Sequence, residues 1–274
     1  MDNIVVGIDE TPASQAALEW VAGRCVRRPT RVKLVNVVSR PRDADESMDL
    51  LTAAESTLRA RVPGQAVELQ HPQGSTVRAL TALAAGADLL VVGVDPNHPV
   101  KAALSGWLPL RVVARSTVPV CIVPTGWDGR AGDITVGLAD DGTSDEALVF
   151  AAREAIARAT RLHVVHVWRD AEFPSDGPTA LVTDPRTVIE QHRHVLDEKV
   201  RALVERFPAL DVESDLVRAS PEAALVEGAD HSELIVIGTH HQGVLFGSFS
   251  GSIAQDIVGR SRCPVCIVPP MPSE

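Results

Sequence analysis

The chain has 274 residues, 45% of them apolar, and it carries a formal net charge of −10 with a pI near 5.4. This acidity argues against a nucleic-acid-binding surface, which requires clustered Lys and Arg, and against attraction to an anionic membrane. No apolar run approaches the roughly 18–20 residues of a membrane span, and four cysteines without a framework spacing indicate a reducing compartment. With no signal peptide expected ahead of the first strand, we expect a cytoplasmic protein that neither binds nucleic acid nor inserts into a membrane.

Apolar β-branched runs alternate with amphipathic segments through the first half of the chain. Thr11 is placed to cap a helix and Pro12 suits its first position, while Gly86 is placed to end a helix over 76–85. Polar residues 40–46 predict a loop, and a further helix follows it with an apolar side from Leu50 to Val62. The strands expected in this half are 3–8, 32–38, 67–69, 89–92 and 120–123.

The second half of the chain repeats the first. Residues 89–124 recur at 234–269 with a displacement of 145, whereas the opening strands recur with a displacement of 130. The difference of 15 residues is an insertion after Val167, over roughly 169–185, where prolines predict an irregular loop. The protein is therefore an internal duplication.

Strands that alternate with helices predict parallel sheets with right-handed crossovers. We expect an α/β protein of two tandem, doubly wound domains, each with a five-stranded parallel sheet, at 1–126 and 133–270. A short linker rich in glycine joins them.

The stretch from Glu233 to Pro269 is the most informative part of the sequence. A buried strand ends at Gly238, a loop rich in Gly, Ser and His follows, and Gly251-Ser252 begins a helix. A strand, a glycine loop and a helix N-terminus form an arrangement that binds phosphate, because the first N–H groups of a helix lack intrahelical partners.

These residues resemble the universal stress protein family, and the likeness covers nearly the whole chain twice. The family marker is a glycine after the fourth strand, a second glycine three residues on, then nine residues and Gly-Ser or Gly-Thr. Gly238, Gly251 and Ser252 match it, with His241 in place of the second glycine. Gly93 and Gly106 match in the first half. The endings STVPVCIVP and SRCPVCIVP also resemble the closing strand of the family. The resemblance implies that the last strands, 120–123 and 265–268, pair within one chain and form a pseudo-twofold monomer that can still form a homodimer.

The resemblance implies a Rossmann-like fold of the adenine-nucleotide hydrolase type that binds ATP, with Mg²⁺ as a possible companion. An acidic residue after the first strand and the end of the second strand hold the adenosine in such proteins. The corresponding candidates in the first half are Asp9, Val37, Gly93 and Gly106. The candidates in the second half are Gly137, Leu138, Ala139, Val167, Ile237, Gly238, His240, His241, Ser250, Gly251, Ser252 and Ile253.

Each half departs from the family pattern in a different way. In the first half Pro96 replaces the second glycine, and proline has no N–H and a fixed φ. Trp107 there replaces the hydroxyl residue. In the second half Ala139 replaces the acid, and the lost hydrogen bonds weaken binding by about ten- to a hundredfold. We therefore predict one weakened ATP site, in the second half.

Plainer interpretations stay open for several motifs. Gly238, Gly251 and Ser252 also fit a strand-ending turn and a helix cap. His240-His241 fit exposed loop histidines better than metal ligands, and Cys263-Pro264-Val265-Cys266 fits buried structural thiols better than a redox or zinc pair. No hydrolase triad or Gly-Lys-Ser/Thr phosphate loop is present.

The sequence therefore predicts a nucleotide-sensing regulatory protein of the stress response with no dedicated catalytic machinery. Binding of ATP would order the loop between Gly238 and Ser252 and change a surface read by an unknown protein partner. The alternative is an interaction scaffold of the same fold that binds no nucleotide. Slow ATP hydrolysis is a third hypothesis, to be tested with Ser252→Ala.

Overall fold

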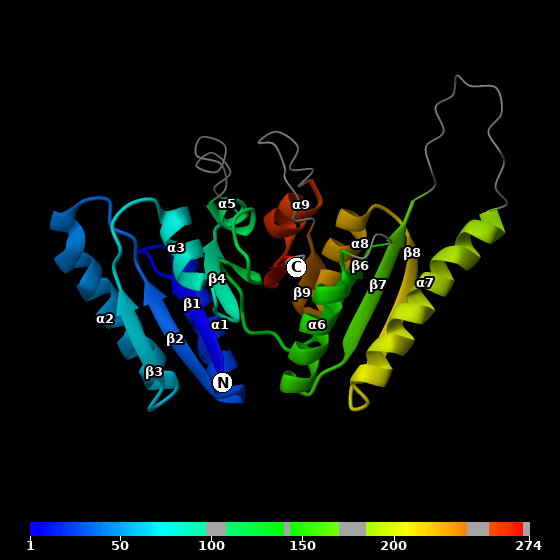
Figure 1. The fold of residues 1–274 in the computed structure, drawn as a ribbon, viewed down its shortest axis with the longest axis horizontal. Coiled ribbons are helices and arrows are strands. Elements are labelled where there is room, and N and C mark those ends of the chain that lie inside the picture. The colour runs from blue at the N-terminus through cyan, green and yellow to red at the C-terminus, as the bar shows by residue number, and fades with distance from the viewer. Residues whose placement is uncertain (97–107, 140–142, 170–184, 240–251, 271–274) are drawn as a thin grey trace, which may run out of the picture.

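The computed structural model describes residues 1–96, 108–139, 143–169, 185–239 and 252–270. Strands and helices alternate in both halves, as the apolar runs predict (Figure 1). The first half contains β1 (Asp2–Gly7), α1 (Pro12–Arg27), β2 (Thr30–Val35), η1 (Pro41–Asp43), α2 (Ala44–Arg61), β3 (Ala66–Gln70), α3 (Thr76–Ala84), β4 (Leu89–Val94), α5 (Leu108–Val113) and β5 (Val120–Pro124). The second half contains β6 (Asp133–Leu138), α6 (Asp145–Arg158), β7 (Leu162–Trp168), α7 (Pro185–Arg206), β8 (Val212–Arg218), α8 (Pro221–Gly228), η2 (Ala229–His231), β9 (Ser232–Gly238), α9 (Ser252–Arg260) and β10 (Val265–Val268).

The predicted start of the first helix and the predicted end of the helix over 76–85 are confirmed. The Thr11 hydroxyl accepts the N–H of Ser14 at 3.2 Å, which satisfies one of the free donors of α1, and Pro12 is the first residue of that helix. Gly86 follows α3 with φ of +88°, a left-handed conformation that side chains with a Cβ disfavour. The insertion after Val167 lies mostly outside the described residues.

Two boundaries in the first half differ from the prediction. The strand expected over 32–38 runs from Thr30 to Val35, and beyond its end Val38 forms an isolated parallel bridge with Gln73. The loop expected over 40–46 is a 3₁₀ turn followed by α2 from Ala44. The acidic residues Asp45 and Glu46 in its first turn suit the positive end of the helix dipole. Polarity there marks the start of a helix and not a loop.

A single ten-stranded sheet runs through the molecule in the order β3-β2-β1-β4-β5-β10-β9-β6-β7-β8. Neighbouring strands within each half are parallel, and β5 pairs with β10 in the antiparallel direction at the centre. Cys121 lies opposite Cys266 in this pairing. The predicted pairing of the two last strands is thus confirmed, and the molecule is a pseudo-twofold pair of five-stranded halves.

Helices cover both faces of the sheet, so each half is doubly wound. Figure 1 shows α3, α5, α9 and α8 above the central part of the sheet and α1 and α6 below it. Two apolar cores correspond to these two faces. One joins α1, α2, α6 and α7 to the sheet, and the other joins α3, α5, α8 and α9 to its opposite side. Both cores continue across the junction of the halves.

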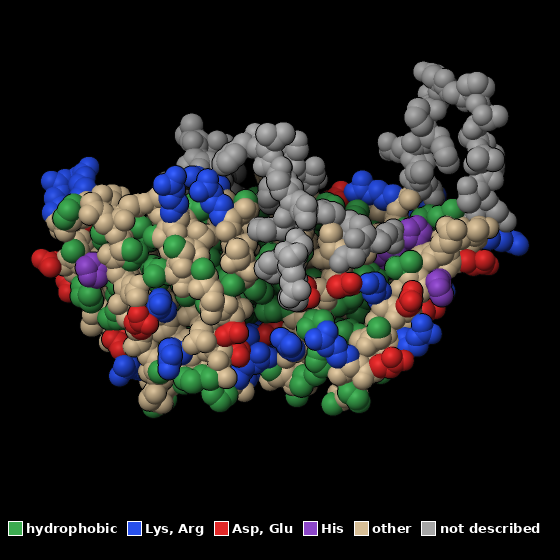
Figure 2. All heavy atoms as spheres, in the orientation of Figure 1, with side chains coloured by type: hydrophobic (Ala, Val, Ile, Leu, Met, Phe, Trp, Pro, Cys, Tyr) green, Lys and Arg blue, Asp and Glu red, His purple; other side chains and the backbone are tan. Residues whose placement is uncertain are grey.

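The surface agrees with the acidic composition. Figure 2 shows Lys and Arg side chains interspersed with Asp and Glu over one face, and not gathered into a single basic area. Among the helices that the structure describes, none is long and apolar enough to cross a membrane.

Candidate functional site

Several of the described candidate residues lie at the carboxyl ends of the central strands of each half. In the order β3-β2-β1-β4-β5, the chain runs outward from β1 to β3 and then crosses to β4 on the other side. The crevice at such a reversal is where open α/β sheets bind ligands. Asp9 follows β1 there and Gly93 lies near the end of β4. In the second half, Gly137 of β6 lies beside Ile237 of β9 in the same relation.

A hollow marks this position in the first half. It has a volume of about 60 Å³, and its walls include Asp9, Val37, Gly93 and Leu108. Ligand sites for drug-sized molecules occupy roughly 300–1,000 Å³, so the hollow is too small for a nucleotide in this conformation. The Asp9 carboxylate accepts the backbone N–H and the hydroxyl of Thr11 at 3.0 and 2.5 Å, and these bonds hold it in the turn before α1.

The second half reproduces the backbone of this turn without the carboxylate. Ser14 Oγ accepts the N–H of Asp9 at 3.0 Å, and Ser144 Oγ accepts the N–H of Ala139 at 2.9 Å. These are twin positions, displaced by 130. The first-turn geometry is therefore the same in the two halves, whereas the side chain at this position is a carboxylate in the first half and a methyl group in the second.

The two strand-end glycines have a packing role. A Cβ built on Gly93 would lie 2.2 Å from the carbonyl carbon and oxygen of Ala13, and one on Gly238 would lie 2.2 Å from the Thr143 oxygen. Side-chain atoms do not approach backbone this closely, so only glycine lets the start of α1 or α6 cross the strand. The plainer interpretation thus explains these glycines without any phosphate.

The helices that follow the predicted phosphate loops differ between the halves. The helix α9 begins at Ser252 and runs for 9 residues, and Ile253 in its first turn is 36% exposed. Its counterpart α5 has 6 residues and contains Pro109. Gly106, His240, His241, Ser250 and Gly251 lie outside the described residues. In the described residues, α9 runs from Ser252 to Arg260 and α5 from Leu108 to Val113.

A histidine that the sequence analysis missed connects the second-half site to α7. His166 is fully buried, and its Nδ1 lies 2.9 Å from the Leu138 carbonyl oxygen. Because a carbonyl only accepts, Nδ1 carries the proton. Its Nε2 lies 3.0 Å from His192 Nδ1, and the His192 ring stacks on Trp168. The twin residue Asn36 donates to the Ile8 carbonyl at 2.7 Å. The displacement of 130 between the halves therefore pairs His166 with a polar residue at the same strand position, and this was the sequence signal that could have found it.

The cysteines are buried free thiols, as predicted. Burial raises the pKa of Cys263 to about 11 and raises the pKa of Cys266 well above its ordinary value. Within the described ranges, no group of three or more His, Cys, Asp or Glu side chains could hold a metal ion.

A second hollow, of about 530 Å³, lies where the linker leaves the first half. Its walls come from the linker, from η2 and from the end of α9, and none of them is a predicted site residue. Arg130 donates to the Asp230 carbonyl at 3.2 Å there and pairs with Asp128, so part of its polar lining is already partnered.

The fold defines a tandem α/β protein in which each half reverses its strand order between two central strands, β1 and β4 in the first half and β6 and β9 in the second. A sequence model of the universal stress protein family matches the chain twice, over residues 1–124 and 132–269. The chain belongs to the universal stress protein family.

Relatives of similar length support this assignment. A universal stress protein of Mycolicibacterium smegmatis is 25% identical over 290 residues, which cover 97% of each chain. Universal stress protein Rv2623 of Mycobacterium tuberculosis is 26% identical over 289 residues, covering 96% of this chain and 95% of the relative. The crystal structure of a universal stress protein from Archaeoglobus fulgidus superposes with a TM-score of 0.72 at 18% identity, covering 98% and 96% of the two chains, and shows the same fold.

Proposed function

We propose that the chain is a regulatory protein of the stress response that binds ATP at one site, in its second half. The observation that carries this proposal is a helix start that follows the strand reversal in the second half, where β9 ends at Gly238 and α9 begins at Ser252. In the first half Trp107 stands at the position equivalent to Ser252, and the hollow at the reversal measures about 60 Å³. A helix N-terminus next to a strand reversal favours an anionic nucleotide.

The proposed site is weak because Ala139 offers no carboxylate to the ribose. Hydrogen bonds to a charged group contribute roughly 1–3 kcal/mol, so their loss lowers affinity by about ten- to a hundredfold. The backbone around Ala139 keeps the twin geometry of Asp9 through Ser144. The residues that remain are therefore suited to the phosphates and the adenine more than to the sugar.

Calorimetric titration of ATP with Mg²⁺ into the purified chain tests the proposal. We expect saturable binding near one ATP per chain, and a loss of affinity of about tenfold or more in Ser252→Ala, because a hydroxyl bond to a charged phosphate is removed. The matched control is Asp9→Ala in the first half, which should leave binding unchanged. Two sites per chain, or an effect of Asp9→Ala on the observed site, would contradict the assignment to the second half.

A second candidate function is an interaction scaffold that binds no nucleotide. The observations that favour it are Ala139 and the close backbone contacts, which explain Gly93 and Gly238 by packing alone. The absence of both binding heat and a melting-temperature shift at millimolar ATP would support the scaffold and refute the ATP site.

We further propose that the protein has no dedicated catalytic activity, that it is cytoplasmic and that it acts through a protein partner and as a homodimer. The dimer must use a surface other than β5 and β10, since these strands already pair with each other. Phosphate release measured at saturating ATP tests the first point. Turnover that Ser252→Ala abolishes would establish slow hydrolysis instead.

A further inference from the structure

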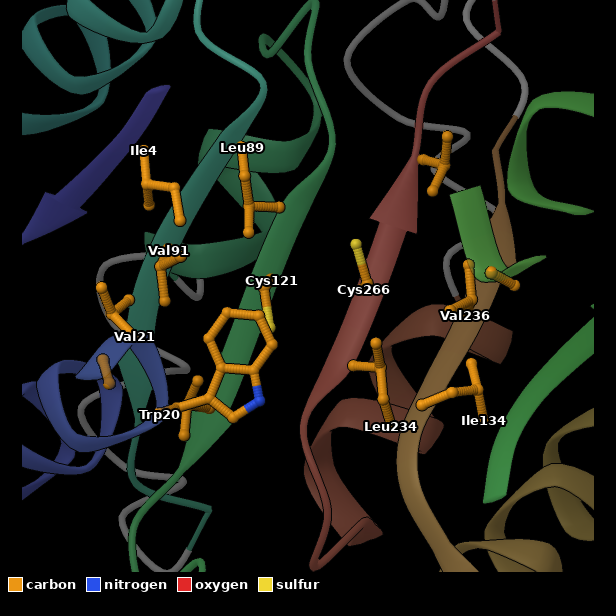
Figure 3. Close-up of a cluster of buried hydrophobic side chains, with 14 of the residues drawn as sticks. Ile4, Trp20, Val21, Leu89, Val91, Cys121, Ile134, Leu234, Val236 and Cys266 are labelled. Carbon is orange, nitrogen blue, oxygen red and sulfur yellow. The ribbon is translucent and has the colours of Figure 1, made fainter. Parts of the chain in front are cut away.

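The seam between the halves has a pseudo-twofold axis that can be located from twin residues. Cys121 and Cys266 are twins, displaced by 145, and they lie opposite each other where β5 pairs with β10. Figure 3 shows them on the two central strands, with the Trp20 indole beside Cys121. A residue that lies opposite its own twin is next to the axis. In a true homodimer, each such residue would face an identical copy of itself.

A second pair of twins meets on the same axis, on the α1 and α6 side of the sheet. Arg24 of α1 and Glu154 of α6 are displaced by 130, and an Arg24 guanidinium N–H donates to the Glu154 carboxylate. Their side chains are 4% and 2% exposed. Here the twins are unlike, so the axis joins a cation to an anion where strict symmetry would join equal charges.

The surrounding groups extend this complementarity. Glu154 also lies 3.1 Å from Arg158 and 3.3 Å from Arg28, and Arg24 lies 3.0 Å from Asp2. Arg158 also forms an ion pair with Glu233 at 2.7 Å, and its guanidinium lies 5.5 Å from the centre of the Trp20 ring. Burial opposes ionisation of Glu154, but Arg24 and Arg158 outweigh it and lower the pKa of the carboxyl.

The charges of this cluster favour the pairing of unlike halves. The first half contributes three cations and one anion, Arg24, Arg27, Arg28 and Asp2, while the second contributes one cation and two anions, Arg158, Glu154 and Glu233. The unlike pair carries a charge of +1, and the Arg27 side chain is 41% exposed, so its charge is partly solvated. Two first halves would bring a charge of +4 into the seam and two second halves a charge of −2. Uncompensated charge in a buried site is strongly unfavourable.

We propose that the seam is a selective recognition surface, on which Arg24 and Glu154 admit the unlike half and reject a second copy of the same half. The partner that fits it is the other half of this chain, from the same molecule or from a second copy that exchanges halves. Like halves cannot form the sheet that unlike halves form.

Cleavage of the folded chain tests this selectivity. A protease site is inserted between Asp128 and Gly129 in the linker, the folded chain is cut, and native mass spectrometry identifies the pairs after incubation at tens of micromolar. We expect unlike pairs to exceed like pairs by at least about a hundredfold, since like-charge contacts cost several kcal/mol. In Arg24→Met with Glu154→Met, like pairs should become detectable. Like pairs at the statistical ratio in the unchanged sequence, or halves that separate completely, would overturn the proposal.

A double-mutant cycle in the uncut chain decides the matter if the halves do not exchange. Each of Arg24→Met and Glu154→Met removes the ion pair across the seam and unbalances the buried charges that remain, so it should lower the folding equilibrium constant by about a hundredfold or more. The double variant should lose much less than the product of the two effects. The control cycle uses Glu55 and Arg59, an exposed pair on α2. Additive effects at Arg24 and Glu154, as expected for the control, would contradict selection by this pair.

Discussion

Gly238→Ala should destabilise the protein in the absence of any nucleotide. The added Cβ would lie 2.2 Å from the Thr143 carbonyl oxygen and 3.2 Å from Ser144 Cα. A normal contact is longer by about 1 Å or more, because carbon atoms pack at roughly 3.5–4.0 Å. The obstacle is backbone at the start of α6, so β9 and α6 must move apart together. Overpacking typically lowers the free energy of unfolding by about 1–3 kcal/mol. Because the backbone obstacle here cannot rotate away, we expect a loss of about 3 kcal/mol or more.

Thermal unfolding followed by circular dichroism measures this cost. For chains of this size, 1 kcal/mol lowers the melting temperature by roughly 2–4 °C, so we expect a decrease of at least about 6 °C. The matched control is Gly23→Ala in α1, where an added Cβ meets nothing within 4 Å and should stabilise the helix by about 0.5–1 kcal/mol. A melting temperature for Gly238→Ala within 2 °C of the unchanged protein, by the same ~2–4 °C per kcal/mol, would refute the packing role of this glycine.

Three further predictions concern the charges, the thiols and the proposed site. Because the pKa of Glu154 is lowered, its contribution to stability is present above its ordinary pKa of 4.5 and is lost as the pH falls through its folded pKa. The free energy of unfolding of Glu154→Gln should therefore fall less steeply below about pH 4.5 than that of the unchanged protein. An unchanged slope of this free energy against pH would contradict the ion cluster. Because burial raises the pKa of Cys263 to about 11, a thiol reagent at pH 8 should modify the cysteines only as fast as the chain unfolds, and rapid modification of the folded chain would show that the thiols are accessible. Ala139→Asp restores the acid found at the twin position Asp9 and should strengthen ATP binding about tenfold in a titration, whereas unchanged affinity would place the ribose elsewhere.

The sequence was sufficient for the elements whose signals are local or repeated. The duplication, the alternation of strands and helices and the Thr11 cap follow from residue patterns, and the structure agrees. The pairing of the last strands followed from the family resemblance, and the structure adds that it is antiparallel. The start of α2 was misjudged because Asp45 and Glu46 are as typical of a first helical turn as of a loop.

Long-range contacts could not be predicted in the same way. Arg24 lies in α1 and Glu154 in α6, and these helices come together only where the two halves meet. The apolar periodicity of each helix therefore does not reveal that the two side chains touch. The packing role of Gly93 and Gly238 likewise depends on where α1 and α6 cross their strands. His166 was overlooked because a histidine within an apolar strand has no local signal, although its twin Asn36 makes the equivalent bond. The assignment of the ATP-site residues stays a prediction.

The linker has a consequence for how tightly the two halves must bind. Residues 125–132 tether β5 to β6, so each half meets the other at an effective concentration of order millimolar, whatever the amount of protein in solution. At micromolar protein this tether is equivalent to about a thousandfold increase in concentration, or about 4 kcal/mol of association free energy. A seam of modest intrinsic affinity is then enough to keep the ten-stranded sheet closed. A single cut in the linker would make closure depend on dilution.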